Sequence, residues 1–234
     1  MARSLLEIAD LQAWYGESHV LHGVEFEVCE GETVTLLGRN GAGKTTTLRS
    51  IMGMIGRRTG SIRHAGAQII GLASHHIARR GIGYVPEERG IFASLTVAEN
   101  LILPPVVAPG GMGLDAIYEL FPNLLERRSS PGTKLSGGEQ QMLAIARILR
   151  TGARLVLLDE PTEGLAPVIV QRIGEVVRAL KADGYTILLV EQNFRFAQAV
   201  ADRHYVMEDG RVVEHFTSAE LPSKMDVLHT YLGV

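Results

Sequence analysis

A glycine-rich stretch that holds one lysine and ends in threonines has the residue types and the spacing, G-x-x-x-x-G-K-[ST], that bind phosphate. It follows the apolar run Val34–Leu37 and opens the segment Thr46–Met54, whose composition favours a helix. Glycines let N–H groups point inward at a phosphate, and the helix N-terminus adds partial positive charge. Lys44 then reaches the β and γ phosphates, and the Thr45 hydroxyl ligates Mg²⁺. The loop comprises Gly38, Arg39, Asn40, Gly41, Ala42, Gly43, Lys44, Thr45 and Thr46.

Two carboxylates follow a second apolar run, Leu155–Leu158. Asp159 and Glu160 would be costly to bury side by side without a cation, so Mg²⁺ supplies a physical reason for the pair. We expect Asp159 to hold Mg²⁺ and Glu160 to polarise an attacking water. A strand that simply runs into a charged loop is the alternative, as an incidental glycine-rich turn is for the phosphate loop.

A third polar group opens a helix that we expect to run to about Arg150. Ser136 with Glu139 has the pattern of a capping box. Gly137 and Gly138 weaken a first turn by about 1 kcal/mol each relative to alanine, so helix nucleation does not favour them. Close approach of a phosphate to bare N–H groups would favour them. The alternative, a plain capped helix, leaves both glycines without an explanation.

The elements that position these groups follow from the apolar pattern. Ligands of parallel α/β sheets bind at the carboxyl ends of the strands, so the polar ends of four buried strands should meet around one nucleotide. The alternation of apolar and charged residues over Val24–Val28 predicts a strand with one solvent-exposed face. Between about 88 and 150 the chain becomes helical, with Thr96 as an N-cap and Pro122 as a break. The four apolar runs are Val34–Leu37, Ile82–Val85, Leu155–Leu158 and Ile187–Val190.

Composition excludes several classes of protein. The net charge of −3 gives no basic bias for nucleic acid, and Cys29 is the only cysteine, so no internal disulfide can form. No apolar run approaches the roughly 18 residues that span a bilayer, and Glu7 and Asp10 interrupt the N-terminal segment. We therefore expect an intracellular protein that does not itself cross a membrane.

The segment Leu135–Gln141 resembles the signature of ATP-binding cassette (ABC) proteins, and it stands between the phosphate loop and Asp159 in the family's order. The likeness covers nearly the whole chain. It implies a single ABC ATP-binding domain over 4–234: a P-loop α/β core with an antiparallel β subdomain and a helical subdomain inserted at about 88–150. It also implies that Tyr15 stacks on adenine.

The same resemblance implies two cassettes that sandwich two ATP molecules head to tail. The signature of one subunit closes over the ATP that the other subunit holds, and the second cassette is a paralogue or a second copy of this chain. A monomer should then bind ATP but hydrolyse it poorly. The signature residues that contact this ATP are Ser136, Gly137, Gly138 and Glu139.

Three positions depart from the commonest cassette pattern. Glu87 stands where a glutamine usually links Mg²⁺ and the attacking water to the membrane subunit. Gln192 stands where a histidine usually contacts the γ-phosphate; its amide can still donate to the phosphate but cannot titrate. Ala166 replaces an aspartate. Glu87 also adds negative charge near the phosphates, which Arg89 is placed to offset.

These departures resemble one branch of the family, the second ATPase subunit (LivF type) of bacterial branched-chain amino acid importers. The resemblance implies an ATP-hydrolysing subunit, peripheral at the cytoplasmic face of the inner membrane, that energises separate membrane permease subunits. A periplasmic binding protein would be reached only through them. The ATPase of a related urea or amide importer, or a soluble ABC ATPase without a transport role, is the alternative. The segments that carry the likeness are Pro86–Glu87, Glu163–Pro167 and Val190–Asn193.

The apolar segment Ile91–Val107 is our candidate for the surface that a coupling helix of the membrane subunit contacts. Its alternative is ordinary packing within the helical insertion. The expected anchors are Leu101, Ile102, Val106 and Val107.

Overall fold

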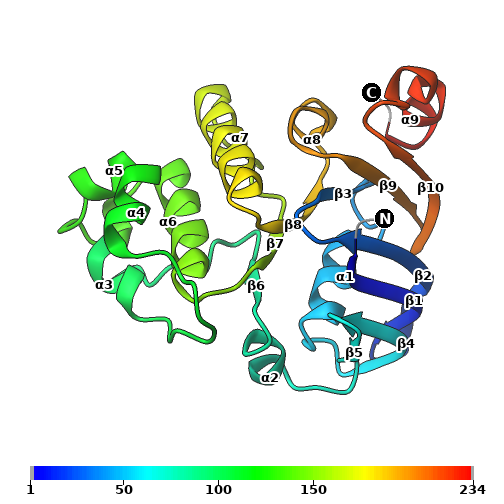
Figure 1. The fold of residues 1–234 in the computed structure, drawn as a ribbon. Helices are drawn as coiled ribbons and strands as arrows, with labels where there is room; N and C mark the ends of the chain where they lie inside the picture. The colour runs from blue at the N-terminus through cyan, green and yellow to red at the C-terminus, as the bar shows by residue number, and fades with distance from the viewer. Residues whose placement is uncertain (1–2, 233–234) are drawn as a thin grey trace.

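The computed structural model describes residues 3–232, with the side chain of 227 left out, and arranges them around two β-sheets (Figure 1). The four-stranded sheet has the order β2-β1-β4-β5, and the six-stranded sheet has the order β10-β9-β3-β8-β7-β6. The strands are β1 (Ser4–Tyr15), β2 (Ser18–Cys29), β3 (Thr33–Leu37), β4 (Arg57–His64), β5 (Ala67–Gln68), β6 (Ile82–Val85), β7 (Leu155–Asp159), β8 (Thr186–Glu191), β9 (Arg203–Glu208) and β10 (Arg211–Thr217).

The helices connect these strands and flank the sheets. None of them, within residues 3–232, combines the length and the apolarity that crossing a bilayer requires. The α-helices are α1 (Lys44–Ile51), α2 (Ser74–Ala78), α3 (Val97–Ile102), α4 (Leu114–Leu120), α5 (Pro122–Glu126), α6 (Gly137–Arg150), α7 (Pro167–Ala182), α8 (Phe194–Val200) and α9 (Met225–Leu232).

Strands β3, β8, β7 and β6 are consecutive parallel strands that end at one edge of the six-stranded sheet, as their apolar sequences predict. β3 pairs with β8, β8 with β7 and β7 with β6, all parallel, and Leu37 lies opposite Glu191 at the carboxyl edge. Every residue of β3, β7 and β8 is buried. The four carboxyl ends therefore meet at one edge of the sheet, which confirms the expected arrangement.

Helix α1 lies between the two sheets, and α7 and α8 lie on the other side of the six-stranded sheet (Figure 1). Leu48 and Ile51 of α1 are fully buried in one core with β1 residues such as Leu6 and β3 residues such as Leu36. The phosphate loop is thus held between the buried end of β3 and a helix that is packed on both sides.

Helices α3 to α6 gather at the end of the molecule away from the four-stranded sheet (Figure 1). Thr96 and Ser136 each cap a helix through a complete capping box, as predicted. The helical stretch expected over 115–128 breaks at Pro122 into α4 and α5. The segment after Ile102 forms no helix before Leu114, as its three prolines predict.

One expected surface anchor is wrong. Leu101 is fully buried and packs in the core that α3 shares with α6 and α7, so for this residue the alternative of internal packing holds. Ile102 and Val106 are 58% and 64% exposed, and Val107 is half-buried. Sequence hydrophobicity alone does not show which face of so short a helix is buried. Here the packing of α3 on α6 determines that the buried face is the one that carries Leu101.

Candidate functional site

The loop between β3 and α1 depends on glycine at two positions. Gly43, the N-cap of α1, has φ 102°, and a Cβ there would meet Leu21 Cδ2 at 2.7 Å. A Cβ on Gly38 would meet the carbonyl oxygen of Met207 at 2.5 Å. No side chain caps α1, and its first turn holds no acidic residue. The first N–H groups of this helix are therefore directed into the loop without a side-chain acceptor, as an anion site requires.

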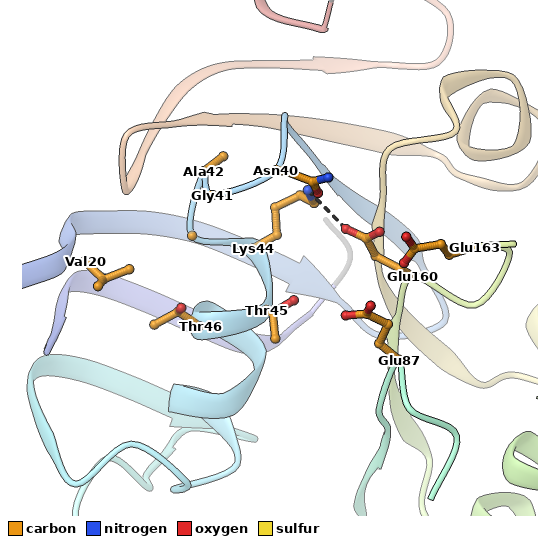
Figure 2. Close-up of a pocket in the computed structure, with 11 residues that line it drawn as sticks. Val20, Asn40, Gly41, Ala42, Lys44, Thr45, Thr46, Glu87, Glu160 and Glu163 are labelled. Atoms are coloured by element: carbon orange, nitrogen blue, oxygen red, sulfur yellow. Dashed lines mark ion pairs between the residues drawn. The ribbon is translucent and has the colours of Figure 1, made fainter. Parts of the chain in front are cut away.

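Lys44 is held with its ammonium group inside this loop. Its side chain is 4% exposed, and Nζ donates to the carbonyl oxygens of Gly38 at 2.8 Å and Arg39 at 3.2 Å. The same Nζ forms an ion pair with Glu160 Oε1 at 3.2 Å (Figure 2). The cavity at this point measures about 410 Å³ and is lined by Val20, Asn40, Gly41, Ala42, Gly43, Lys44, Thr45, Thr46, Glu87, Glu160 and Glu163.

Asp159 meets Thr45 as the sequence predicts, and it gains a partner that the sequence did not indicate. Thr45 Oγ1 donates to Asp159 Oδ1 at 2.9 Å, and the Tyr84 hydroxyl donates to Oδ2 at 2.8 Å. Burial raises the pKa of the fully buried Asp159 against the opposing effect of these two hydrogen bonds. A nearby divalent cation would favour its charged form.

Glu160 and Gln192 lie together at the ends of β7 and β8. Gln192 Nε2 donates to Glu160 Oε2 at 2.9 Å and Oε1 at 3.2 Å, and also to Asn40 Oδ1. The Glu160 N–H donates to Val190 O at 3.0 Å, and its backbone has φ 44°, a conformation that non-glycine residues seldom adopt. The two residues predicted to serve the γ-phosphate are thus in direct contact.

Two further carboxylates face the cavity from the side opposite Val20 and Thr46 (Figure 2). Burial, followed by the negative charge of Glu163, raises the pKa of Glu87. Glu163 also lines the cavity, although the sequence marked it only as the first residue of the segment Glu163–Pro167. No group of three or more His, Cys, Asp or Glu side chains within residues 3–232 is placed to hold a metal ion. A Mg²⁺ ion here would draw on Thr45, Asp159 and Glu87 together with phosphate oxygens, a hard oxygen set that suits this ion.

The signature residues and Tyr15 do not line this cavity. Ser136, Gly137, Gly138 and Glu139 lie at the start of α6 in the helical part of the chain. Tyr15 is 46% exposed at the end of β1. Stacking on adenine and contact of the signature with a partner's nucleotide stay predictions.

Arg89 does not offset Glu87, contrary to expectation. Its guanidinium lies over Gly137, where a Cβ would meet Nη1 at 3.2 Å, and Nη1 donates to Gln140 Oε1 at 3.4 Å. The backbone of Arg89 adopts φ 63°, which turns the side chain toward α6. The closeness of Arg89 to Glu87 in sequence could not show this, because the direction of the side chain depends on backbone conformation.

A loop that offers unpartnered N–H groups, a buried lysine and a set of carboxylates has the parts for binding and cleaving a nucleoside triphosphate. The family model described as ABC transporter matches residues 21–163, more than half of the chain. The chain belongs to the ABC transporter family and is an ATP-binding cassette ATPase that binds nucleotide.

Relatives of known assignment cover the chain almost completely. The high-affinity branched-chain amino acid transport ATP-binding protein BraG of Pseudomonas aeruginosa is 45% identical over 232 residues, which are 98% of this chain and 100% of BraG. The lipopolysaccharide export system ATP-binding protein LptB of Escherichia coli (strain K12) is 35% identical, over 97% of each chain.

Solved structures share the fold. An ATP-binding subunit of an ABC transporter has a TM-score of 0.80 at 31% identity, over 98% of this chain and 96% of that one. An ATP-binding cassette of an ABC transporter in its ADP conformation has a TM-score of 0.82 at 25% identity, over 99% of both chains. The predicted α/β P-loop cassette fold is confirmed.

Proposed function

We propose that this chain is the ATP-hydrolysing subunit of a bacterial importer of branched-chain amino acids. The observation that carries the proposal is the 45% identity that spans the whole of BraG, against 35% to the export protein LptB. We further propose that residues 4–234, of which 233 and 234 lie outside the described residues, form one cassette with the helical subdomain inserted at about 88–150. Substrate choice would reside in separate membrane subunits, since the cavity in this chain is a phosphate site.

Each residue of the site has its own role in binding or cleaving ATP. The loop N–H groups and Lys44 bind the β and γ phosphates, and Lys44 exchanges its ion pair with Glu160 for the γ-phosphate. Glu160, released from Lys44, accepts the proton of the attacking water. Gln192, already in contact with Glu160, orients this carboxylate and donates its amide to the γ-phosphate. Mg²⁺ held by Thr45, Asp159 and Glu87 would neutralise charge that develops on the phosphate oxygens.

The partners follow from what the chain exposes. The start of α6 offers Ser136 to Glu139 to the ATP of a second cassette, either a paralogue or a second copy. Exposed Ile102 and Val106 supply apolar area for a permease coupling helix, which would keep the chain at the cytoplasmic face of the inner membrane. A periplasmic binding protein would act only through the permease, and nucleic acid is no partner.

Deleting the gene in its source organism tests the proposal. High-affinity uptake of radiolabelled leucine, isoleucine and valine should be lost and should return with the wild-type gene but not with a Glu160→Gln gene. Loss of urea or short-chain amide uptake instead would identify the alternative importer. Unchanged uptake of all these solutes would contradict an import function.

A further inference from the structure

Glu191 is a buried carboxylate that does not line the cavity and directly precedes Gln192 in the chain. Glu191 is the last residue of β8 and is 2% exposed, and it forms no ion pair within residues 3–232. A buried carboxylate without a cation is costly unless hydrogen bonds satisfy its oxygens. Its position therefore calls for a reason other than stability.

The oxygens of Glu191 bridge two loops. Oε1 accepts from the Thr162 N–H at 3.2 Å and from its hydroxyl at 2.7 Å, and Oε2 accepts from the Asn193 N–H at 3.1 Å. Thr162 belongs to the turn after β7, and Asn193 belongs to the loop after β8. Thr162 is itself only 5% exposed, so both partners of the short hydroxyl bond are shielded from water.

The two bridged loops carry the residues that act on ATP. Glu160 precedes Thr162 by two positions, and Gln192 lies between Glu191 and Asn193. Glu160 holds φ 44°, a strained conformation that persists only where the surrounding structure enforces it. The Glu160 N–H bond to Val190 restrains one side of the turn, and the bond between Thr162 and Glu191 restrains the other.

We propose that Glu191 is a positioning residue for ATP hydrolysis: its buried carboxylate ties the turn Glu160–Thr162 to the loop Gln192–Asn193 and so aligns Glu160 with Gln192. The inference rests on the proposed ATPase site and concerns this site alone. Neither Glu191 nor Thr162 lines the cavity, so the bridge acts on the catalytic step through Glu160 rather than on nucleotide affinity.

The bridge depends on the ionised form of Glu191. Burial, together with the negative charge of Glu160, raises the pKa of Glu191 to about 7 against three hydrogen bonds that lower it. Lys44, the lysine of the phosphate loop, is paired with Glu160. Protonation would remove the negative charge that these donors meet, and so weaken the bridge as the pH falls through this value. Gln192 cannot titrate, so Glu191 is the group beside it that responds to neutral pH.

The test uses the natural complex, purified through a tag on this chain with its membrane subunits, and measures ATP turnover. Glu191→Gln should lower kcat by about tenfold to a hundredfold at about pH 8, in line with the cost of a small misalignment, and leave KM for ATP within about twofold. Because glutamine resembles the protonated acid, the difference in kcat should shrink toward about pH 6.

Matched variants separate positioning from folding. Thr162→Val removes only the hydroxyl donor and should lower kcat as Glu191→Gln does. The double variant that combines these two substitutions should show no additional loss. Thr162→Ser keeps the donor and should retain wild-type kcat. Glu220→Gln is the control, because Glu220 accepts from the Thr217 N–H and hydroxyl, both at 2.8 Å, at an exposed remote turn. It should change nothing.

Three results would overturn the inference: wild-type kcat in Glu191→Gln at about pH 8, a loss that appears in KM alone, or a difference that does not change with pH. If Glu191→Gln does not assemble, Thr162→Val against Thr162→Ser decides, since equal kcat in these two excludes the bridge. Failure of the proposed function would look different. A complex that hydrolyses ATP but does not move amino acids still reports on Glu191.

Discussion

Helices α1 and α6 both have a glycine at their start, as the N-cap of α1 and as the first residue of α6, and their first turns are built in opposite ways. Helix α1 has Gly43 as its N-cap, no side-chain cap and a lysine as its first residue. Helix α6 is capped by Ser136 and carries Glu139 in its first turn, where the Glu139 N–H donates to Ser136 Oγ at 3.3 Å and Glu139 Oε2 accepts from the Ser136 N–H at 2.7 Å.

The difference shows what each helix start can do without a partner. The first turn of α6 is satisfied within the chain, so its fold is independent of any ligand, and only the N–H groups beside Gly137 and Gly138 remain to be offered outward. The first turn of α1 has no such cap and adds the charge of Lys44, so it is suited to a phosphate within this subunit. We propose that the start of α1 binds phosphate within this subunit and that the start of α6 contributes to a site that a partner subunit completes.

The largest expected effect tests the site at α1. Glu160→Gln should lower ATP turnover of the assembled transporter by about 10²–10⁴-fold, because glutamine cannot take the proton of the attacking water. ATP binding should remain, since the substitution removes only the ion pair that Lys44 exchanges for phosphate. Turnover by steady-state phosphate release and binding by equilibrium titration check the two parts.

Glu175→Gln on α7 is the control for charge removal, because Glu175 is exposed and, in the part of the chain that the structure describes, forms its one ion pair with Arg172. It should leave turnover unchanged. Near wild-type turnover in Glu160→Gln would exclude Glu160 as the general base.

A matched pair of glycine substitutions tests the contrast directly. Gly43→Ala forces a side chain into φ 102° and against Leu21, with strain of about 1–3 kcal/mol, so ATP affinity of the isolated chain should fall by about tenfold or more. Gly137→Ala meets only the flexible tip of Arg89, and the isolated chain should bind ATP as the wild type does. Equal losses in a fluorescent-nucleotide titration would contradict separate roles for the two helix starts.

The sequence predicted what depends on neighbours in the chain. Capping boxes at Thr96 and Ser136 are local patterns of four residues, and both form as expected. The apolar runs predicted buried parallel strands because full burial on two faces leaves few polar positions. Parallel pairing then brings the ends of these strands together, so the meeting of Thr45 with Asp159 and of Gln192 with Glu160 could also be foreseen.

What the sequence did not reveal depends on backbone conformation and on packing between distant segments. Arg89 and Glu160 have positive φ although neither is glycine, so their residue types did not predict these conformations. Leu101 is buried because α6 packs on its face of α3. Tyr84 of β6 bonds Asp159 of β7, and Glu191 of β8 bonds Thr162 in the turn after β7. These residues are far apart in sequence, and no local pattern predicts the contacts.

The structure also assigns different reasons to the two glycines of α6. A Cβ on Gly138 would meet Ile169 Cγ2 at 2.7 Å, so this glycine is needed for the packing of α6 on α7 whatever ligand approaches. In Gly138→Ala, overpacking should lower the free energy of unfolding by about 1–3 kcal/mol. The higher helix propensity of alanine should offset about 1 kcal/mol of this loss. Urea denaturation measures the difference.

Ile169→Ala is the companion variant for Gly138→Ala. It removes the side chain that the new Cβ would meet, so the double variant should lose less stability than the sum of the two single variants. Additive losses would place the cause elsewhere.

The smallest expected effect separates the cap of α6 from its contact with a partner's nucleotide. Ser136→Ala should lower stability by about 1 kcal/mol, or about 2–4 °C in Tm, because one capping bond is lost. Thr96→Ala removes the equivalent bond from α3, at 3.2 Å, and should cost a similar amount. If Ser136 also contacts ATP across the dimer, only Ser136→Ala should slow turnover of the assembled complex, while ATP binding by the isolated chain stays unchanged in both variants. Equal turnover in the two would reduce Ser136 to a helix cap.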